Sequence, residues 1–109
     1  MRLLLHSDDL LFGSRLHAEL SAAGHEVRST GGAIPTADDA DLIIADLTAD
    51  AALRIEQLAT LQGRPPVLAF YSHVEVDVRE RALAAGLERV VPRSRMAREA
   101  VALVGATAS

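Results

Sequence analysis

Four short runs of apolar residues, none alternating apolar with polar positions, constrain most strongly what this chain can fold into. They span residues 3–5, 42–45, 67–71 and 90–91. Continuous runs of this length are typical of strands buried on both faces, as in a parallel sheet that helices cover. A more polar fifth segment, residues 26–30, is expected to form an edge-like strand.

Helical patterns lie between these strands. Apolar residues recur every three or four positions in four segments, at 10–23, 49–61, 74–85 and 96–104. Strands that alternate with helices predict right-handed βαβ units and a parallel sheet. We therefore expect an α/β chain with one flavodoxin-like domain, a five-stranded parallel sheet of order 2-1-3-4-5 with helices on both faces.

The segment between the second and third predicted strands departs from this alternation. Residues 31–40 contain Gly31-Gly32, Pro35 and Asp38-Asp39, which favour a loop or at most one helical turn. The second helix of the fold is therefore expected to be short or missing.

Chain length and composition bound the organisation. With 109 residues, half of them hydrophobic and 24% charged, the chain is expected to form one domain at 1–104 and a flexible tail at 105–109. No apolar run approaches the ~20 residues that a membrane helix needs. The N-terminus also lacks the pattern of a signal peptide. We therefore expect a cytoplasmic protein with no membrane partner.

Several functions are excluded by missing residue types. Without cysteine there are no disulfides and no cysteine-ligated metals. All eleven basic residues are arginine, so lysine Schiff bases and P-loop lysines are impossible. A net charge of −4 and only three aromatic residues argue against nucleic-acid partners. Neither a nucleophile elbow nor a dinucleotide fingerprint is present.

Acidic residues are expected to gather where the winding of the sheet reverses. In the predicted order, the carboxyl ends of the first and third strands meet at this point. Ser7, Asp8 and Asp9 follow the first strand, and Asp46 follows the third. Close carboxylates repel one another, which favours a divalent cation such as Mg²⁺ or an uptaken proton.

Two further polar residues follow the neighbouring strands. Ser72 could offer a hydroxyl and Arg93 a positive charge. Such a set suits phosphoryl chemistry with Asp46 as the nucleophile. A plainer interpretation stays open, in which residues 7–9 cap the following helix and complement its dipole.

At this point the chain resembles the receiver domain of two-component response regulators, over about residues 2–104. The resemblance rests on the order and spacing of four pieces, namely the first strand with its Asp8-Asp9 pair, Ala23-Gly24-His25-Glu26-Val27, Asp41-Leu42-Ile43-Ile44-Ala45-Asp46-Leu47 and Ala82-Leu83-Ala84-Ala85-Gly86.

The resemblance implies a role for each matching residue. Asp46 would accept a phosphoryl group from a histidine kinase, and Asp8 would bind Mg²⁺, with Asp9 as a further candidate ligand. Thr48 would give the metal its backbone carbonyl. The Ser72 hydroxyl would approach the phosphoryl group, and Arg93 would offset the charge of that group.

The chain departs from the family pattern at several of these places. Arg93 stands where the family has lysine, and Ser94 stands where a proline usually follows. Ser7 takes the first acidic position and Val90 the position of the switch aromatic. The loop after Asp46 is several residues short. The resemblance is therefore to a divergent receiver, or pseudo-receiver.

These observations favour a bacterial stand-alone signalling protein that is not an enzyme. It would act in a phosphorelay through Asp46, with Mg²⁺ at Asp8. Alternatively, it would be a phosphorylation-independent module that binds a protein partner or a second copy of itself. The docking face would be formed by residues 74–85, 90–91 and 96–104, including Val76, Leu83 and Val90. A flavodoxin-like protein that binds a small molecule or nucleotide is a third hypothesis.

Overall fold

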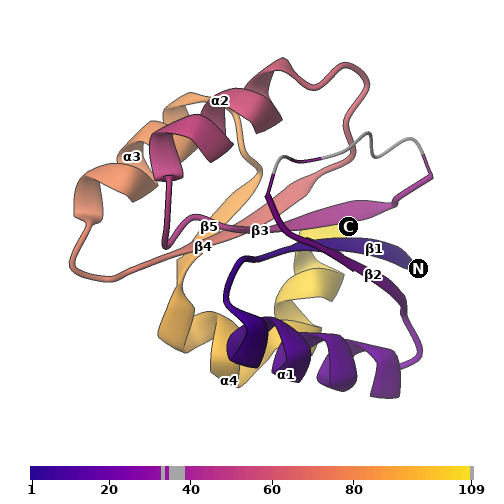
Figure 1. Cartoon of the computed structure of the whole chain (residues 1–109). Coiled ribbons are helices and arrows are strands. Elements are labelled where there is room, and N and C mark those ends of the chain that lie inside the picture. The colour runs from indigo at the N-terminus through magenta and orange to yellow at the C-terminus, as the bar shows by residue number, and fades with distance from the viewer. Residues whose placement is uncertain (33, 35–38, 109) are drawn as a thin grey trace.

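Five parallel strands form one sheet in the order β2-β1-β3-β4-β5, which confirms the predicted topology (Figure 1). This computed structural model describes residues 1–32, 34 and 39–108. None of the helices described is long and apolar enough to cross a membrane. The strands and helices, in chain order, are β1 (Arg2–His6), α1 (Leu10–Ala22), β2 (Glu26–Thr30), β3 (Leu42–Asp46), α2 (Ala51–Thr60), β4 (Val67–Tyr71), α3 (Val76–Ala84), β5 (Arg89–Pro92) and α4 (Arg93–Ala108).

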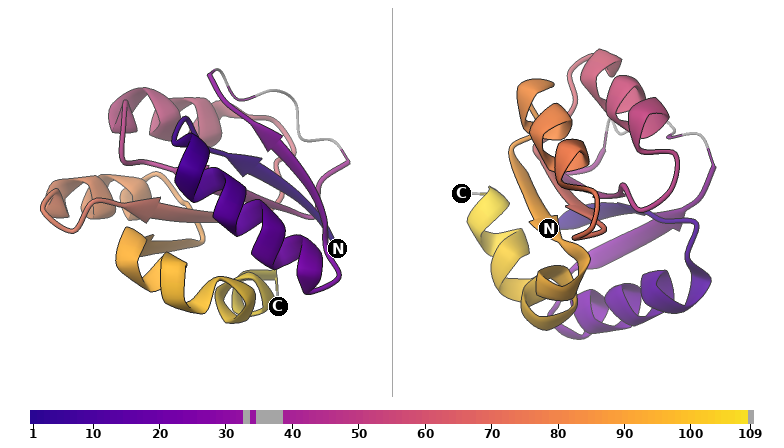
Figure 2. Two further views of the ribbon diagram at one scale, coloured as in Figure 1. Left: turned by 60° about the horizontal axis from the view of Figure 1, so that its bottom comes forward. Right: turned by 90° about the vertical axis from the view of Figure 1, so that its left-hand side faces the viewer.

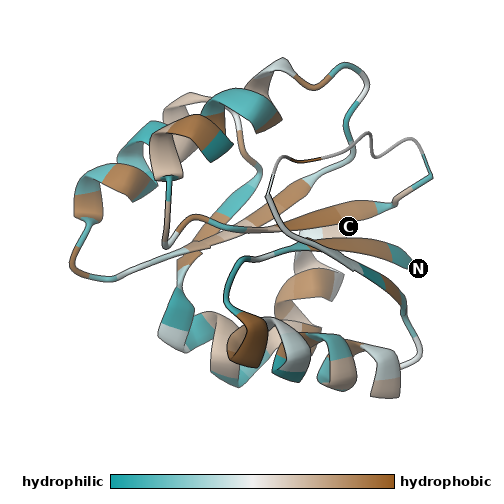
Figure 3. Cartoon of the chain, viewed as in Figure 1, coloured by the Kyte–Doolittle hydropathy of each residue, from teal (hydrophilic) through white to brown (hydrophobic). Residues whose placement is uncertain are grey.

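Two helical layers enclose the sheet. Helices α1 and α4 cover one face, and α2 and α3 cover the other (Figures 1 and 2). Neighbouring residues of one strand pack against the helices on opposite faces of the sheet, because side chains alternate along a strand. In β1, Leu3 and Leu5 pack with α1 and α4, whereas Leu4 packs with α2 and α3. Burial on both faces explains the unbroken apolar runs, which appear as hydrophobic strands in Figure 3.

The C-terminal helix is longer than predicted. It runs from Arg93 to Ala108, with a non-helical backbone at Glu99 (φ −129°). Residues 105–108, which we expected to be a tail, are therefore helical, and Ser109 lies outside the described residues. Thr107 is buried and its hydroxyl donates to the carbonyl of Leu103 at 2.7 Å. The helix thus continues past Gly105, despite the low helix propensity of glycine.

The predicted docking face is only partly exposed. Val76 at the start of α3 is 59% exposed, and Leu83 on the same helix is also exposed. Val90, in contrast, is only 7% exposed, because it packs with Val78 and Ala82 of α3 in the core. Including Val90 in a docking surface was therefore wrong.

Between β2 and β3 the structure describes no helix. Residues 31, 32, 34, 39 and 40 are turns, bends or irregular backbone. The remainder of the expected loop, residues 33 and 35–38, lies outside the described part of the chain. The described residues agree with a second helix that is short or missing.

Glu88 ties the start of β4 to the turn before β5. One of its carboxylate oxygens accepts from the Arg64 guanidinium at 2.7 Å and from the backbone N–H of Val67 at 2.8 Å. The same guanidinium donates to the carbonyl of Gly86 at 2.9 Å. Burial acts to raise the pKa of Glu88, but the hydrogen bonds from Arg64 and Val67 outweigh it and hold this pKa below its ordinary value.

We expect Glu88→Gln to lower the free energy of unfolding by about 1 kcal/mol at neutral pH, since the ion pair is partly exposed to solvent. A depressed carboxyl pKa stabilises the fold above the ordinary glutamate pKa, and this contribution disappears as the pH falls through the folded-state value. Urea unfolding across the acidic range should therefore show wild type and variant converging at low pH. Glu80→Gln, on the exposed face of α3, is the control. A difference that persists unchanged at low pH would contradict this account.

Candidate functional site

The pairing of β1 with β3 places Ser7 against Asp46. In this register His6 lies beside Ala45, so the next residue of each strand emerges at the same edge of the sheet. The Ser7 hydroxyl donates to Oδ2 of Asp46 at 2.7 Å. Only 6% of Asp46 is exposed, so this carboxylate lies at the floor of the site.

The other oxygen of Asp46 is bound by the loop that follows. Oδ1 accepts from the backbone N–H of Thr48 at 2.8 Å and from its hydroxyl at 2.5 Å. The loop then turns through Asp50, whose left-handed backbone (φ 52°) leads into α2. Three donors thus hold the Asp46 carboxylate. The groups of Thr48 that engage it are the amide and the hydroxyl, whereas the resemblance implied a role for the carbonyl.

Asp8 is held from two other directions. Its Oδ1 accepts from the backbone N–H of Gly32 at 2.9 Å, and its Oδ2 lies 3.3 Å from a guanidinium nitrogen of Arg54. The Gly32 hydrogen bond and the Arg54 guanidinium hold the pKa of Asp8 below its ordinary value, against the opposing effect of burial. Gly31 makes this arrangement possible, because a Cβ at that position would lie 2.9 Å from Oδ1 of Asp8.

Arg54 is the residue of this site that the sequence analysis missed. Its side chain is only 6% exposed, although it carries a full charge. One nitrogen donates to Gln57 at 3.1 Å, and Nε has no partner among the described residues. A signal was present, because Arg54 occupies the helical stripe that also contains Ala51, Ile55 and Leu58. A charged residue on an apolar stripe indicates a buried partner.

Asp9 caps a helix, which is one of the roles that the sequence analysis gave it, and it also pairs with Arg93. As the N-cap of α1, it accepts from the backbone N–H of Phe12 through Oδ1 at 3.0 Å. Its Oδ2 accepts from Arg93 at 3.2 Å. The Arg93 guanidinium also lies 4.2 Å from the centre of the Phe12 ring, which in turn contacts Phe70 edge-on at 5.2 Å. Arg93 is thus held by an acid and an aromatic face together.

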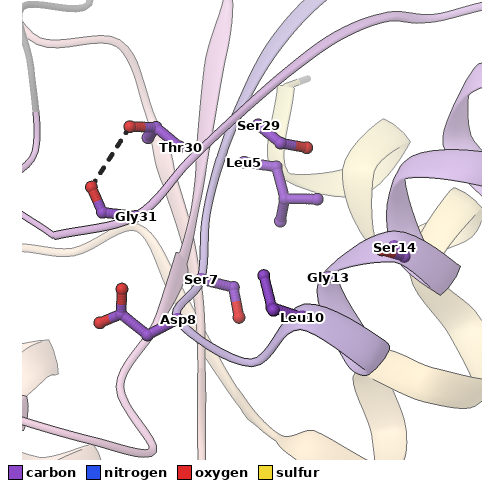
Figure 4. Close-up of a pocket in the computed structure, with 9 residues that line it drawn as sticks. All are labelled: Leu5, Ser7, Asp8, Leu10, Gly13, Ser14, Ser29, Thr30 and Gly31. Carbon is purple, nitrogen blue, oxygen red and sulfur yellow. Dashed lines mark hydrogen bonds between the residues drawn. The ribbon is translucent and has the colours of Figure 1, made fainter.

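Three hollows open around these side chains. A cavity of about 310 Å³ is lined by Asp8, Asp9, Asp46, Thr48 and Ala49. Ser72 and Arg93 lie in a larger hollow of about 660 Å³, which Asp9 and Thr48 also line. Every residue that the sequence analysis assigned to the site therefore lies at this edge of the sheet. A third pocket of about 320 Å³, shown in Figure 4, is lined by Leu5, Ser7, Asp8, Leu10, Gly13, Ser14, Ser29, Thr30 and Gly31.

The donor set does not fit Mg²⁺ as it is arranged. Mg²⁺ demands near-octahedral oxygen ligands. Asp8 and Asp9 each have one oxygen against a guanidinium and the other on a backbone N–H. Asp46 has both oxygens hydrogen-bonded within the protein. In residues 1–32, 34 and 39–108, no three histidine, aspartate or glutamate side chains are grouped so that they could hold a metal ion.

Comparison with known proteins identifies the fold. No protein-family model and no curated protein matches the chain. Among solved structures, the signal receiver domain of a response regulator from Bermanella marisrubri superposes with a TM-score of 0.83 at 13% identity, covering 99% of this chain and 98% of that one. The non-phosphorylated HemR receiver domain from Leptospira biflexa superposes with a TM-score of 0.82 at 20% identity, covering 99% and 94%.

A third structure is a response regulator from Burkholderia pseudomallei with a phosphorylated aspartic acid, a calcium ion and citrate. It superposes with a TM-score of 0.74 at 19% identity, covering 98% of this chain and 68% of that one. The chain therefore has the fold of response-regulator receiver domains, as the sequence analysis predicted. Identities this low leave the chemistry to be argued from the site.

We expect Gly31→Ala to displace the Asp8 carboxylate, because the new methyl group would lie too close to its Oδ1. Loss of the Gly32 and Arg54 contacts should lower the free energy of unfolding by about 1 kcal/mol and return the pKa of Asp8 toward its ordinary value. Urea unfolding and an NMR titration of the side-chain carboxyls measure the two effects. Gly105→Ala is the control for an added methyl group that meets no atom of the described chain within 4 Å; it should leave the pKa of Asp8 unchanged and should not lower the free energy of unfolding, because alanine favours a helix. An unchanged Asp8 pKa would show that Gly31 does not shape this site.

Proposed function

We propose that this protein is a receiver-like signalling domain that acts by binding other proteins and does not depend on phosphorylation of Asp46. The observation that carries the proposal is the state of the Asp46 carboxylate. Both of its oxygens accept hydrogen bonds from Ser7 or Thr48, and the residue is almost fully buried. Hydrogen bonds donated to a carboxylate oxygen withdraw electron density from it, so both oxygens of Asp46 are weakened as nucleophiles toward phosphorus.

The state of Arg93 supports the same proposal. A cation that is to meet a phosphoryl group must be free to approach it, whereas Arg93 is engaged by Asp9 and by the face of Phe12. Arginine also lacks the compact ammonium of the lysine that the family resemblance leads one to expect. We call the edge of the sheet that carries Asp8, Asp9 and Asp46 the acidic edge. Its carboxylates all contact groups of the chain itself.

The surface through which such a module would act is the exposed side of α3. Val76 and Leu83 project from this helix into solvent, and Val74 lies exposed just before it. Exposed apolar side chains on one element favour a protein partner or a second copy of the chain. Val101 of α4, on the other face of the sheet, is also exposed.

Phosphoryl transfer to Asp46 is a second candidate, which the convergence of Ser72, Arg93 and Thr48 on one hollow favours. In that reaction an Asp46 oxygen would attack the phosphorus of a phosphohistidine or an acyl phosphate, and the bond to the donor would break. Phosphorylated aspartate and calcium are present in the response regulator from Burkholderia pseudomallei. Here the donor would be a histidine kinase.

Incubation with acetyl phosphate and Mg²⁺, followed by intact-mass measurement, separates the two candidates. We expect the mass of the wild-type protein to stay unchanged, while a response regulator that is phosphorylated under these conditions gains one phosphoryl group in parallel. Asp46→Asn is the matched control, since it preserves the size of the side chain. A phosphoryl group gained by wild type and absent from Asp46→Asn would refute the first candidate and establish the second.

A further inference from the structure

We propose that Arg54 is the built-in counter-ion of the acidic edge and takes the electrostatic role of a divalent cation, so that Mg²⁺ binds there more tightly once Arg54 is removed. The inference rests on the proposed function, in treating this edge as one that works without a metal. It concerns a residue of α2 whose role neither composition nor family resemblance supplies.

The first support is that the Arg54 charge is fixed in place. Its side chain is 94% buried, so it cannot exchange freely with solvent. A buried guanidinium is costly unless it is paired and hydrogen-bonded. Arg54 has two such partners, the carboxylate of Asp8 and the side-chain oxygen of Gln57. Its position is therefore a built feature of the fold, unlike that of an exposed arginine.

The second support is that Asp8 is shaped to meet Arg54. Gly31 leaves the space that Oδ1 occupies, and the N–H of Gly32 is aimed at that oxygen. These contacts leave Oδ2 facing the guanidinium at 3.3 Å. Gly32 adopts a positive φ of 65°, a conformation that glycine adopts at little cost. The N–H of Gly32 therefore binds one oxygen of Asp8, and the guanidinium of Arg54 binds the other.

The third support is the balance of charge. Asp8, Asp9 and Asp46 line one cavity, and two guanidinium groups, those of Arg54 and Arg93, already contact two of these carboxylates. A divalent cation entering here would approach fixed positive charge, which disfavours its binding. Mg²⁺ also gives up its water reluctantly and needs free carboxylate oxygens in compensation. Ser7 adds a hydroxyl donor beside Asp46 where a further acid would have offered a ligand.

The test is a Mg²⁺ titration of wild type, Arg54→Met, Ser7→Asp and the double variant, followed by amide NMR and thermal unfolding. We expect wild type to show no selective shift of the Asp8, Gly32 and Asp46 amides at millimolar Mg²⁺. Arg54→Met should bind Mg²⁺ about tenfold more tightly than wild type, since a positive charge 3.3 Å from the half-exposed carboxylate of Asp8 is removed. The double variant should bind more tightly than either single variant. Arg79→Met, an exposed change on α3, is the charge-matched control.

Two results would overturn the inference. One is selective binding of millimolar Mg²⁺ by wild type at Asp8, which needs no variant to fold. The other is full Mg²⁺ affinity in Ser7→Asp with no further gain when Arg54 is removed, because the missing acid would then be the whole cause. If Arg54→Met does not fold, Arg54→Gln replaces it with the same expectation.

The outcome is independent of the labelling experiment. A protein that binds Mg²⁺ and yet gains no phosphoryl group would overturn this inference and leave the proposed function intact. A protein that is phosphorylated at Asp46 without selective Mg²⁺ binding would overturn the proposed function and leave the role of Arg54 standing.

Discussion

The parallel pairing of β1 with β3 is the constraint on which the rest of the site depends. These strands are neighbours in the sheet although β2 lies between them in the chain, because the winding reverses at this point. Their register brings the residue after His6 beside the residue after Ala45. The hydrogen bond from Ser7 to Asp46 follows directly. A slip of one residue would turn every side chain of β1 to the opposite face of the sheet and would move Ser7 out of register with Asp46.

Given that juxtaposition, the protein must manage three carboxylates at one edge. A bound cation is one solution, and proton uptake is another. This structure contains a third solution, in which arginines from α2 and from the start of α4 contact the two carboxylates that follow β1. Asp46 forms no ion pair with either of these two arginines in the described part of the chain and instead accepts hydrogen bonds from the neutral hydroxyls of Ser7 and Thr48. Each acid thus has an internal partner, and the edge is ordered by contacts within the chain.

The sequence was sufficient for the sheet and for the location of the site. Strands buried on both faces have unbroken apolar runs, so the sequence revealed them. In a parallel sheet the carboxyl ends of the strands share one edge, so the predicted order was enough to place Asp8 near Asp46. Arg54 was missed because a search for apolar periodicity discards a charged residue within the stripe. Val90 was misassigned because a two-residue apolar run does not reveal which face of the sheet each side chain meets. The helix at 105–108 was missed because Gly105 and the small residues after it carry no apolar periodicity.

The chain contains no lysine, so the positive charge directly after β5 is that of an arginine, Arg93. A lysine ammonium is a point charge on a flexible stem, whereas the planar guanidinium of Arg93 binds Asp9 at its edge and packs its face on Phe12. Phe12 lies on α1 and also contacts Phe70 of β4. The start of α4, the start of α1 and the end of β4 are thereby joined through one side chain. Phe12 and Phe70 belong to the core layer under α1 and α4, whereas α3 packs on the opposite face of the sheet. The junction around Arg93 is therefore separate from the layer to which α3 belongs.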